Sequence, residues 1–284
     1  MSRAEFVDIL CIGSGSAGLA AGIAEADAGS KVLVVELNRE VTSPTRVVGA
    51  SVESWTTLLQ RRWCVEEFNS STNNYLEELT SSLGPAAHGK TSRHLPVGTV
   101  ETFADVKVDP TQAVPPFHGA DLAKWARECL TSPYGLMLSR VSSPRLTPMR
   151  KVDGPAIRAG LIAPVPTSRS RDMTVRQWLS ELAGERGVTV QESCAVQRLI
   201  FHDGQLVGAV FDTPEGVRTV RARRGVVLGT SCSAGDDTLA MSPMAPGGGT
   251  TLCLVGRPAS RFARLEFLRS AASYSQCAAP GRLA

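Results

Sequence analysis

This sequence of 284 residues lacks the features that mark a membrane protein or a nucleic-acid-binding protein. No uninterrupted apolar stretch reaches the roughly 18 residues of a membrane span, and acids and a glycine turn interrupt the N-terminal segment that a signal peptide would need. A formal charge of +3 is small, and the basic residues are spread along the chain. The sequence therefore predicts neither a membrane span nor a nucleic-acid partner.

Metal-binding and hydrolase motifs are also missing. The seven cysteines contain no CxxC pair, and the four histidines show no metal-ligand spacing. We expect the cysteines to be buried hydrophobic side chains in a reducing, cytoplasmic protein. No GxSxG motif is present, which argues against a serine hydrolase. The cysteines are Cys11, Cys64, Cys129, Cys194, Cys232, Cys253 and Cys277.

What the N-terminal segment does contain is the pattern of a dinucleotide-binding unit. A short apolar strand is predicted over Val7–Ile12, and a glycine turn (Gly13–Gly18) follows it. An amphipathic, alanine-rich helix over Leu19–Ala28 leads to a second strand, Val32–Val35, which ends at the acid Glu36. The alternative, a glycine-rich turn that binds nothing, does not explain why the strand, helix, second strand and acid follow in this order.

Each glycine of the turn has a physical role in such a unit. Gly13 permits the tight turn, Gly15 lets the backbone approach a pyrophosphate, and Gly18 lets the helix pack on the strand. The N–H groups at the start of the helix then face the diphosphate. Glu36 follows at about the expected twenty residues and can accept hydrogen bonds from a ribose 2′-hydroxyl, so a 2′-phosphate, and hence NADP, is disfavoured.

The chain divides into four segments by composition. We predict the N-terminal part of the nucleotide domain over 1–83, an inserted cap or substrate region over 84–170, the second part of the nucleotide domain over 171–235, and a poorly defined tail over 236–284. Eleven prolines between 84 and 170 break any long element there. This inserted region could close over a cofactor or form loop.

Helices are predicted at three places after Glu36. Apolar residues at steps of three and four predict two helices over 54–83, with a polar joint at Asn69–Asn74. Asp121 can cap a short helix over Leu122–Leu130, and Met173–Arg186 reads as an amphipathic helix.

Strands dominate the second half of the sequence. An antiparallel meander is predicted over Val196–Phe201, Leu206–Thr213 and Val217–Ala222, because Asp203-Gly204 and Pro214-Glu215-Gly216 have turn chemistry. It leads into a buried parallel strand that ends at Gly229-Thr230. In the tail we expect a short strand over Leu252–Val255 and a basic amphipathic helix over Ser260–Ser270.

This order of motifs resembles that of the FAD-dependent oxidoreductases of the fumarate reductase and 3-ketosteroid dehydrogenase type. The likeness covers Val7–Glu36 and Met173–Thr230. It implies an α/β fold, a Rossmann-like doubly wound FAD-binding domain with an antiparallel β-meander and an inserted, loop-rich substrate or cap region. It also implies FAD as the cofactor and hydride transfer between the flavin N5 and a small organic or steroid-like substrate.

The resemblance also implies site residues. The residues that wrap the diphosphate would be Gly13, Ser14, Gly15, Ser16, Ala17 and Gly18; Glu36 would hold the adenosine ribose, the backbone of Val196 would meet adenine, and Gly229 and Thr230 would pass close to the dinucleotide. The sequence differs from the family where Ala-Thr-Gly-Gly is replaced by Gly229-Thr230-Ser231-Cys232.

The flavin-ring half of the family's site has fewer counterparts. The glycine-rich stretch after the ribose acid is reduced to Gly49 within Val41–Ser54, and the family's C-terminal glycine segment does not occur before Ala284. The resemblance therefore predicts a chain shortened at the C-terminus, with a homo-oligomer or a partner chain as a way to complete the flavin site.

No catalytic residue of the family transfers to a position of this sequence. A proton relay needs a side chain within reach of the substrate, and the candidates in the inserted region are His118, Arg127, Tyr134 and Arg140. Tyr134 is the first to test, although a tyrosine between proline and glycine also suits a packed loop anchor. Two other functions stay open: a shortened, non-catalytic nucleotide-binding relative, and an NAD-binding dehydrogenase.

Overall fold

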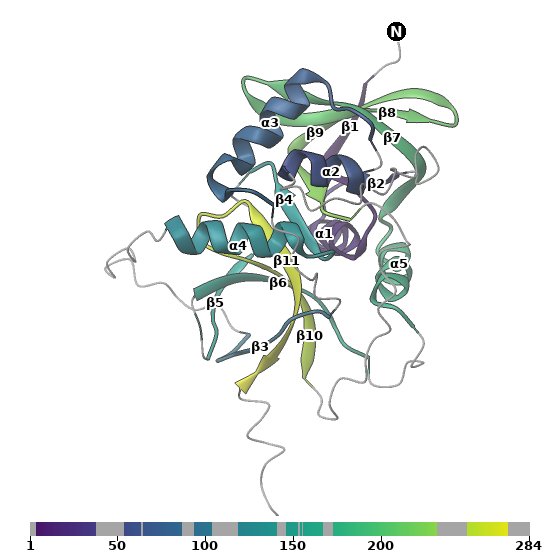
Figure 1. Cartoon of the computed structure of the whole chain (residues 1–284). Coiled ribbons are helices and arrows are strands. Elements are labelled where there is room, and N and C mark those ends of the chain that lie inside the picture. The colour runs from purple at the N-terminus through teal and green to yellow at the C-terminus, as the bar shows by residue number, and fades with distance from the viewer. Residues whose placement is uncertain are drawn as a thin grey trace, which may run out of the picture.

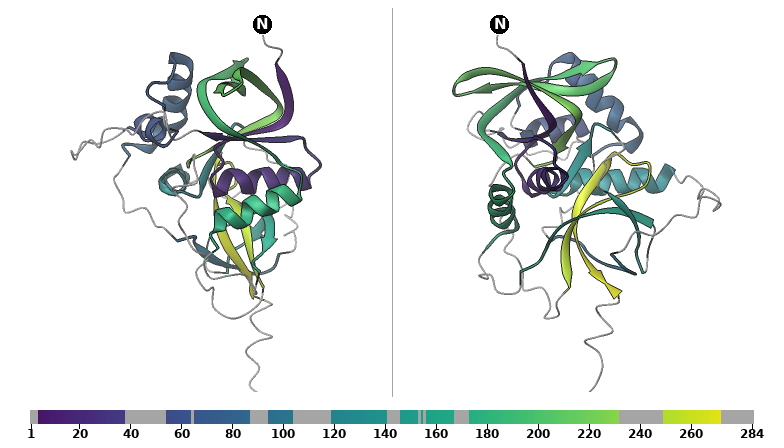
Figure 2. Two further views of the ribbon diagram at one scale, coloured as in Figure 1. Left: turned by 90° about the vertical axis from the view of Figure 1, so that its right-hand side faces the viewer. Right: turned by 180° about the vertical axis from the view of Figure 1, so that it is seen from behind.

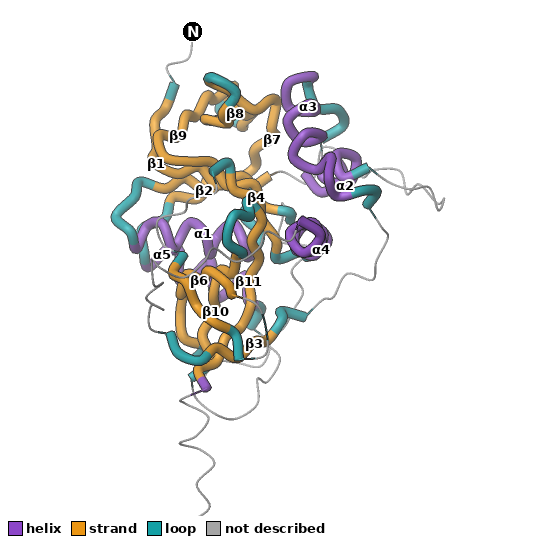
Figure 3. Tube along the Cα trace, turned by 90° about the vertical axis from the view of Figure 1, so that its left-hand side faces the viewer, coloured by secondary structure: helices purple, strands orange, loops and turns teal. Residues whose placement is uncertain are grey.

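The computed structural model describes residues 4–37, 54–63, 65–86, 94–103, 119–140, 146–152, 154, 156–166, 173–231 and 249–271. Within them the chain forms an α/β protein built around one large mixed sheet (Figures 1 and 3). The predicted features that lie outside these residues are the stretch after Glu36 with Gly49, the candidate His118, and Cys64, Cys232 and Cys277.

The parallel strands that the sequence predicts form one part of this sheet. β1 (Glu5–Ile12) and β2 (Val32–Leu37) pair in parallel and are connected by α1 (Ser16–Asp27). β7 (Thr189–His202) pairs in parallel with the far side of β2, and β9 (Gly216–Gly229) pairs in parallel with the far side of β1. The order β7-β2-β1-β9 is that of a doubly wound nucleotide domain, which confirms the predicted fold class.

The meander is also confirmed, and it closes on the parallel strands. β8 (Gln205–Thr213) pairs antiparallel with both β7 and β9. Asp203 and Gly204 have φ angles of 48° and 71°, the left-handed conformation that a two-residue hairpin turn needs. Because β9 then pairs with β1, the five strands form a closed circuit. β9 is one continuous strand, not the two separate strands that the sequence suggests.

α1 is buried on nearly all sides, so the prediction of an amphipathic helix is wrong. The helix contacts β1 and β2 on one side and β6 (Ala156–Pro164), β10 (Thr250–Gly256) and β11 (Phe262–Ser270) on the other, as Figure 1 shows. Its alanines and glycines allow this close packing, which a helix with longer side chains could not reach.

The four helices that follow β2 in the chain lie on the opposite side of the strands from α1 (Figure 3). They are α2 (Trp55–Trp63), α3 (Ser70–Thr80), the short 3₁₀ helix η1 (Ser81–Leu83) and α4 (Gly119–Thr131). The two predicted helices of 54–83 are confirmed, but their joint lies earlier, because Asn69 caps α3 by accepting a hydrogen bond from Thr72 N at 3.1 Å. Asp121 lies in the first turn of α4 and not at its N-cap.

The antiparallel strands extend the sheet beyond β9. Their order is β9, β4, β11, β10, β6, β5, and β3 pairs in parallel with β11. The strands not yet described are β3 (Val97–Val100), β4 (Gly135–Leu138) and β5 (Thr147–Arg150). The predicted strand Leu252–Val255 is confirmed within β10. The predicted helix Ser260–Ser270 is wrong, because Phe262–Ser270 form β11, a strand buried on both faces. The division of the chain into four segments stays a prediction.

Helix α5 (Val175–Glu185) precedes β7 and packs beside α1 (Figure 2). The predicted helix is confirmed, and its start is fixed by a capping box. Thr174 Oγ1 accepts a hydrogen bond from Gln177 N at 3.1 Å, and Gln177 Oε1 accepts one from Thr174 N at 2.9 Å. None of the described helices is long and apolar enough to cross a bilayer.

Candidate functional site

The glycine turn lies at the carboxyl end of β1. Gly13 has a φ of 100° and donates its N–H to Val35 O at 2.9 Å, which fixes the turn against β2. A Cβ on Gly18 would lie 1.9 Å from Gly13 O, so this position accepts no side chain. The helix therefore begins in direct contact with the turn, as expected for a glycine that packs a helix on its strand.

The end of β9 lies directly beside this turn. A Cβ on Gly15 would come within 2.9 Å of Ser231 O and 3.1 Å of Ser231 Cβ. A Cβ on Gly229 would lie 3.3 Å from Ile12 O and 3.6 Å from Gly13 O. The structure thus brings Gly13–Gly18 and Gly229–Ser231 together. Residue 15 must be glycine also because a larger side chain there would collide with Ser231.

Glu36 and Val196 lie at the same edge of the sheet. Glu36 is the penultimate residue of β2, and its side chain is 24 % exposed. Val196 follows Cys194 by two residues on β7, and Cys194 pairs with Leu37. The predicted ribose and adenine contacts therefore come from neighbouring strands, next to the glycine turn.

Thr230 connects this edge to the inserted region. Its buried hydroxyl lies 2.7 Å from Ser132 O and 2.9 Å from Gly135 O. The loop that carries Tyr134 is therefore adjacent to the predicted cofactor residues. The Tyr134 side chain itself is 1 % exposed within a hydrophobic cluster, which is the environment of a packed anchor. A catalytic role for Tyr134 stays a prediction.

The other catalytic candidates are dispersed. Arg127 donates a hydrogen bond from Nη1 to Leu83 O at 3.0 Å, which joins α4 to η1. Arg140 is exposed at the end of β4, and His118 lies outside the described residues.

Two residues at this edge were not predicted from the sequence. Trp63, fully buried in α2, donates its indole N–H to Gly229 O at 2.9 Å. Arg176 in α5 donates from Nε to Ser14 O at 3.2 Å and from Nη2 to Glu36 Oε2 at 3.1 Å. The sequence did hold one signal for Arg176, which lies in the first turn of the helix that precedes the parallel strand β7. In a doubly wound sheet such a helix begins at the edge where the glycine turn lies.

The electrostatics of the turn suit a diphosphate. The N-cap of α1 is Gly15, which has no side chain to bond the first N–H groups of the helix. These groups carry the positive end of the helix dipole, and the Arg176 guanidinium, which is also paired with Glu36, lies beside Ser14. Gly15 and Gly18 keep the turn narrow. The residues present therefore fit the diphosphate of a dinucleotide.

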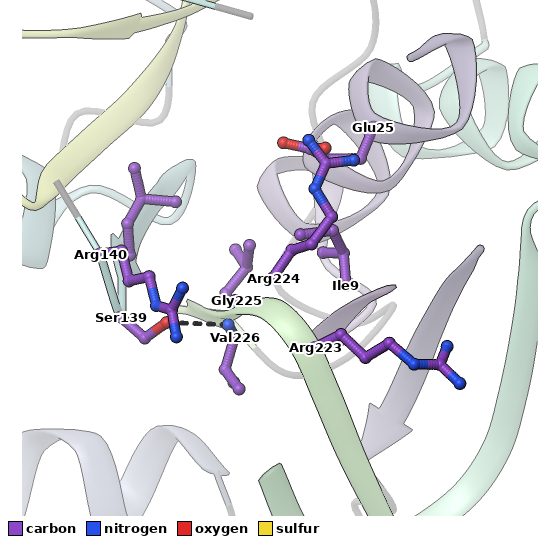
Figure 4. Close-up of a pocket in the computed structure, with 10 residues that line it drawn as sticks. Ile9, Glu25, Ser139, Arg140, Arg223, Arg224, Gly225 and Val226 are labelled. Carbon is purple, nitrogen blue, oxygen red and sulfur yellow. Dashed lines mark hydrogen bonds between the residues drawn. The ribbon is translucent and has the colours of Figure 1, made fainter. Parts of the chain in front are cut away.

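A pocket elsewhere on the molecule contains none of the predicted cofactor residues (Figure 4). It is lined by Ile9, Glu25, Leu138, Ser139, Arg140, Arg223, Arg224, Gly225, Val226 and Val227. It opens where β4 ends, at Ser139, whose Oγ accepts a hydrogen bond from Val226 N at 2.8 Å. Two of its arginines contact side chains at the protein surface: Arg223 lies 3.6 Å from Asp8, and Arg224 donates a hydrogen bond to Ser30 Oγ at 2.6 Å.

The described cysteines are free thiols in the core. Cys11, Cys129, Cys194 and Cys253 are buried, as expected. Burial raises the pKa of Cys194 to about 11 and that of Cys253 to about 12, and it raises the pKa of Cys11 and Cys129 as well. Among the described residues, no three His, Cys, Asp or Glu side chains are grouped as metal ligands would be.

We expect these four thiols to resist alkylation in the folded protein. At pH 8 a thiol with a pKa of about 11 is ionised in about one molecule in a thousand, and the thiolate is the reactive form. Native protein treated with iodoacetamide, then digested and analysed by mass spectrometry, should carry no label at these positions, whereas protein labelled in denaturant should carry it at all four. Rapid labelling of native Cys194 or Cys253 would contradict their burial.

Comparison with known proteins identifies a family. A family model described as "FAD binding domain" matches residues 8–253. None of the curated proteins matches the chain. Among solved structures, similarity is found to 3-ketosteroid-Δ4-(5α)-dehydrogenase from Rhodococcus jostii RHA1 in complex with 4-androstene-3,17-dione, at 19 % identity and a TM-score of 0.31 over 80 % of this chain and 46 % of that one.

Two further solved structures are similar at the same level. The open conformation of a flavocytochrome c3 fumarate reductase is 16 % identical, with a TM-score of 0.31 over 80 % of this chain and 34 % of that one. Aklavinone-11 hydroxylase in a ternary complex with FAD and aklavinone is 18 % identical, with a TM-score of 0.27 over 78 % and 32 %. The chain spans less than half the length of each of these three proteins.

Proposed function

Because this chain belongs to the FAD binding domain family, we propose that it acts in an FAD-dependent oxidoreductase that transfers hydride between the flavin and a small organic or steroid-like substrate. The observation that supports this most directly is the glycine turn, narrowed by Gly15 and Gly18 and placed at the same edge as Glu36. When bound, FAD supplies the hydride chemistry, and the protein supplies binding and orientation.

In this proposal the chain's own residues hold the adenosine diphosphate half of FAD. The backbone N–H groups of Gly13–Gly18 and the start of α1 bind the diphosphate, and Glu36 accepts a hydrogen bond from the ribose 2′-hydroxyl. The backbone of Val196 meets adenine, and Gly229 and Thr230 pass close to the dinucleotide. Ser231, in contact with the turn, closes the same side of the site.

The proposal extends to the cellular location and the substrate of the protein. The protein is cytoplasmic, as the free, buried thiols among the described residues suggest. Its substrate is a small molecule.

A visible spectrum tests the proposal against its alternatives. The purified chain, incubated with FAD and freed of excess cofactor by gel filtration, should carry flavin bands near about 370 and 450 nm, which belong to the cofactor itself. A chain that retains NADH but shows no flavin bands would be an NAD-binding dehydrogenase. A chain that carries flavin yet turns over no ketone, alkene or alcohol substrate would fit the non-catalytic relative.

Replacing Gly15 by valine should remove FAD binding. A Cβ at residue 15 already meets Ser231 O at 2.9 Å, and the larger side chain would also enter the space of the diphosphate. We expect FAD affinity, measured by quenching of flavin fluorescence, to fall by at least about 100-fold, since the diphosphate would lose charged hydrogen bonds to the turn, each worth about 1.5–3 kcal/mol.

Gly184→Val is the matched control for this change. Gly184 lies in α5, and a Cβ there would meet no atom within 4 Å. This variant should bind FAD like the unaltered chain. Unweakened binding by Gly15→Val would show that the dinucleotide lies elsewhere.

A further inference from the structure

Arg176 joins the two parts of the predicted dinucleotide site that the sequence places on either side of α1. Its Nε and Nη2 donate to Ser14 O and Ser14 Oγ at 3.2 and 3.3 Å, and Nη2 also donates to Glu36 Oε2 at 3.1 Å. The side chains of Arg176 and Glu36 are only 18 % and 24 % exposed. A residue from α5 thus contacts both the glycine turn and the ribose acid.

The packing of two helices brings Arg176 to this place. α5 lies beside α1, as Figure 2 shows. Side chains of α5 contact the residues at the beginning and at the end of α1. At the start, Arg176 contacts Ser14, and at the end, Arg186 Nη1 lies 3.0 Å from Asp27 Oδ1. The two helices therefore run parallel, and both begin at the edge that holds the glycine turn.

The position of Arg176 within α5 is unfavourable for the helix itself. Thr174 is the N-cap, so Arg176 is the second residue of the first turn, where the helix dipole disfavours a positive charge. Its contacts with Glu36 and the Ser14 carbonyl offset this cost. The arginine at this position is thus explained by what it contacts and not by the stability of α5.

The contact leaves part of Glu36 available. Arg176 occupies Oε2, and within the part of the chain that the structure describes, Oε1 has no hydrogen-bond partner. A carboxylate held at one oxygen loses the freedom to rotate away, so its other oxygen is kept ready for a ribose hydroxyl. Such preorganisation lowers the entropy that ligand binding must overcome.

We infer that Arg176 is a positioning residue of the dinucleotide site, which orients Glu36 and the glycine turn for the ribose and diphosphate of the adenosine half. This inference rests on the proposed function and extends it to a residue outside the β1-α1-β2 unit. Arg176 sets the preference of the site for a ribose that carries a 2′-hydroxyl, because it acts through the acid that accepts that hydroxyl.

The test compares ADP with 2′-deoxy-ADP, by isothermal titration calorimetry on the full chain. The unaltered protein should prefer ADP by about tenfold, the effect of one hydrogen bond to a charged group. Arg176→Met should bind ADP about tenfold more weakly and show a preference near one, since Glu36 is no longer held. Adding Glu36→Gln to Arg176→Met should change the preference no further, because the two residues act as a unit.

Arg186→Met is the matched control. It removes an arginine of the same helix pair, but its partner Asp27 lies at the other end of α1 and both side chains are exposed. This variant should keep the tenfold preference. Arg176→Lys, which retains the charge and can reach one acceptor at a time, should be intermediate, and it carries the test if Arg176→Met does not fold.

Three results would overturn the inference. Equal loss of affinity for both nucleotides in Arg176→Met, with the preference intact, would make the residue a packing contact only. An unaltered protein that binds ADP and 2′-deoxy-ADP equally would show that Glu36 does not reach the ribose. An unaltered protein that binds neither nucleotide and no FAD would refute the proposed function itself, and this outcome is distinct from the other two.

Discussion

Gly18→Ala is expected to lower the free energy of unfolding by about 3 kcal/mol and to remove FAD binding. The new Cβ would lie 1.9 Å from Gly13 O and 3.1 Å from Gly13 C, both backbone atoms. The turn cannot yield easily, because Gly13 N is bonded to Val35 O. α1 cannot yield either, since strands enclose it on two sides. Urea denaturation followed by tryptophan fluorescence, together with flavin retention, measures both effects.

Gly184→Ala separates this clash from the general effect of replacing a helical glycine. A Cβ at Gly184 meets no atom within 4 Å, so this variant should be as stable as the unaltered chain or more stable by up to about 1 kcal/mol. If Gly18→Ala behaved like Gly184→Ala, the close contact between turn and helix would not exist in solution.

Glu266→Gln should destabilise the protein by about 3 kcal/mol. Glu266 lies on β11 and is fully buried, with Oε2 2.6 Å from Lys151 Nζ and Oε1 2.9 Å from Arg264 Nη2. The amide would leave the mostly buried Lys151 ammonium without a neutralising charge, and Arg264 would keep only its ion pair with Glu128. The same denaturation measurement gives the loss, and the slope against urea should stay unchanged if the fold is retained.

Asp27→Asn is the control for an ion pair in water. The Asp27 and Arg186 side chains are 38 % and 41 % exposed, so removing this pair should cost less than about 1 kcal/mol. A Glu266→Gln variant that lost no more than Asp27→Asn would show that the buried charges on β11 rearrange or hydrate without cost.

Local sequence patterns predicted the elements whose neighbours are close in the chain. The β1-α1-β2 unit and the meander are confirmed, because their turns, caps and strand lengths are set by residues within each segment. β11 was predicted as a helix because Phe262, Leu265 and Leu268 follow at steps of three. In the fold, α4 covers one face of β11 and α1 the other (Figure 3), so both faces are buried and the alternation of buried and exposed residues typical of a half-exposed strand is lost.

The candidate site, like the fold, was predictable only where its residues are close together in the sequence. The glycine turn and Glu36 follow one another in sequence, and the structure keeps them at one edge of the sheet. Arg176 and Trp63 were not predicted because their partners lie more than 130 residues away in the sequence. Helical periodicity shows only whether a residue faces the core or the solvent. Which surface an outward arginine meets depends on the topology, and the topology is fixed by strand pairs across the whole chain.

The burial of α1 has a consequence for how the chain acquires its structure. The helix is complete as a sequence by Asp27, yet its outer side packs against β6, β10 and β11, which end with Ser270. During synthesis on the ribosome, α1 must therefore wait for more than two hundred further residues before it can lose its exposed apolar side. Contacts of such sequence separation form slowly because a long loop must close first. The segment that is easiest to recognise in the sequence is thus among the last to be fully enclosed, and until then it is a surface that chaperones can bind.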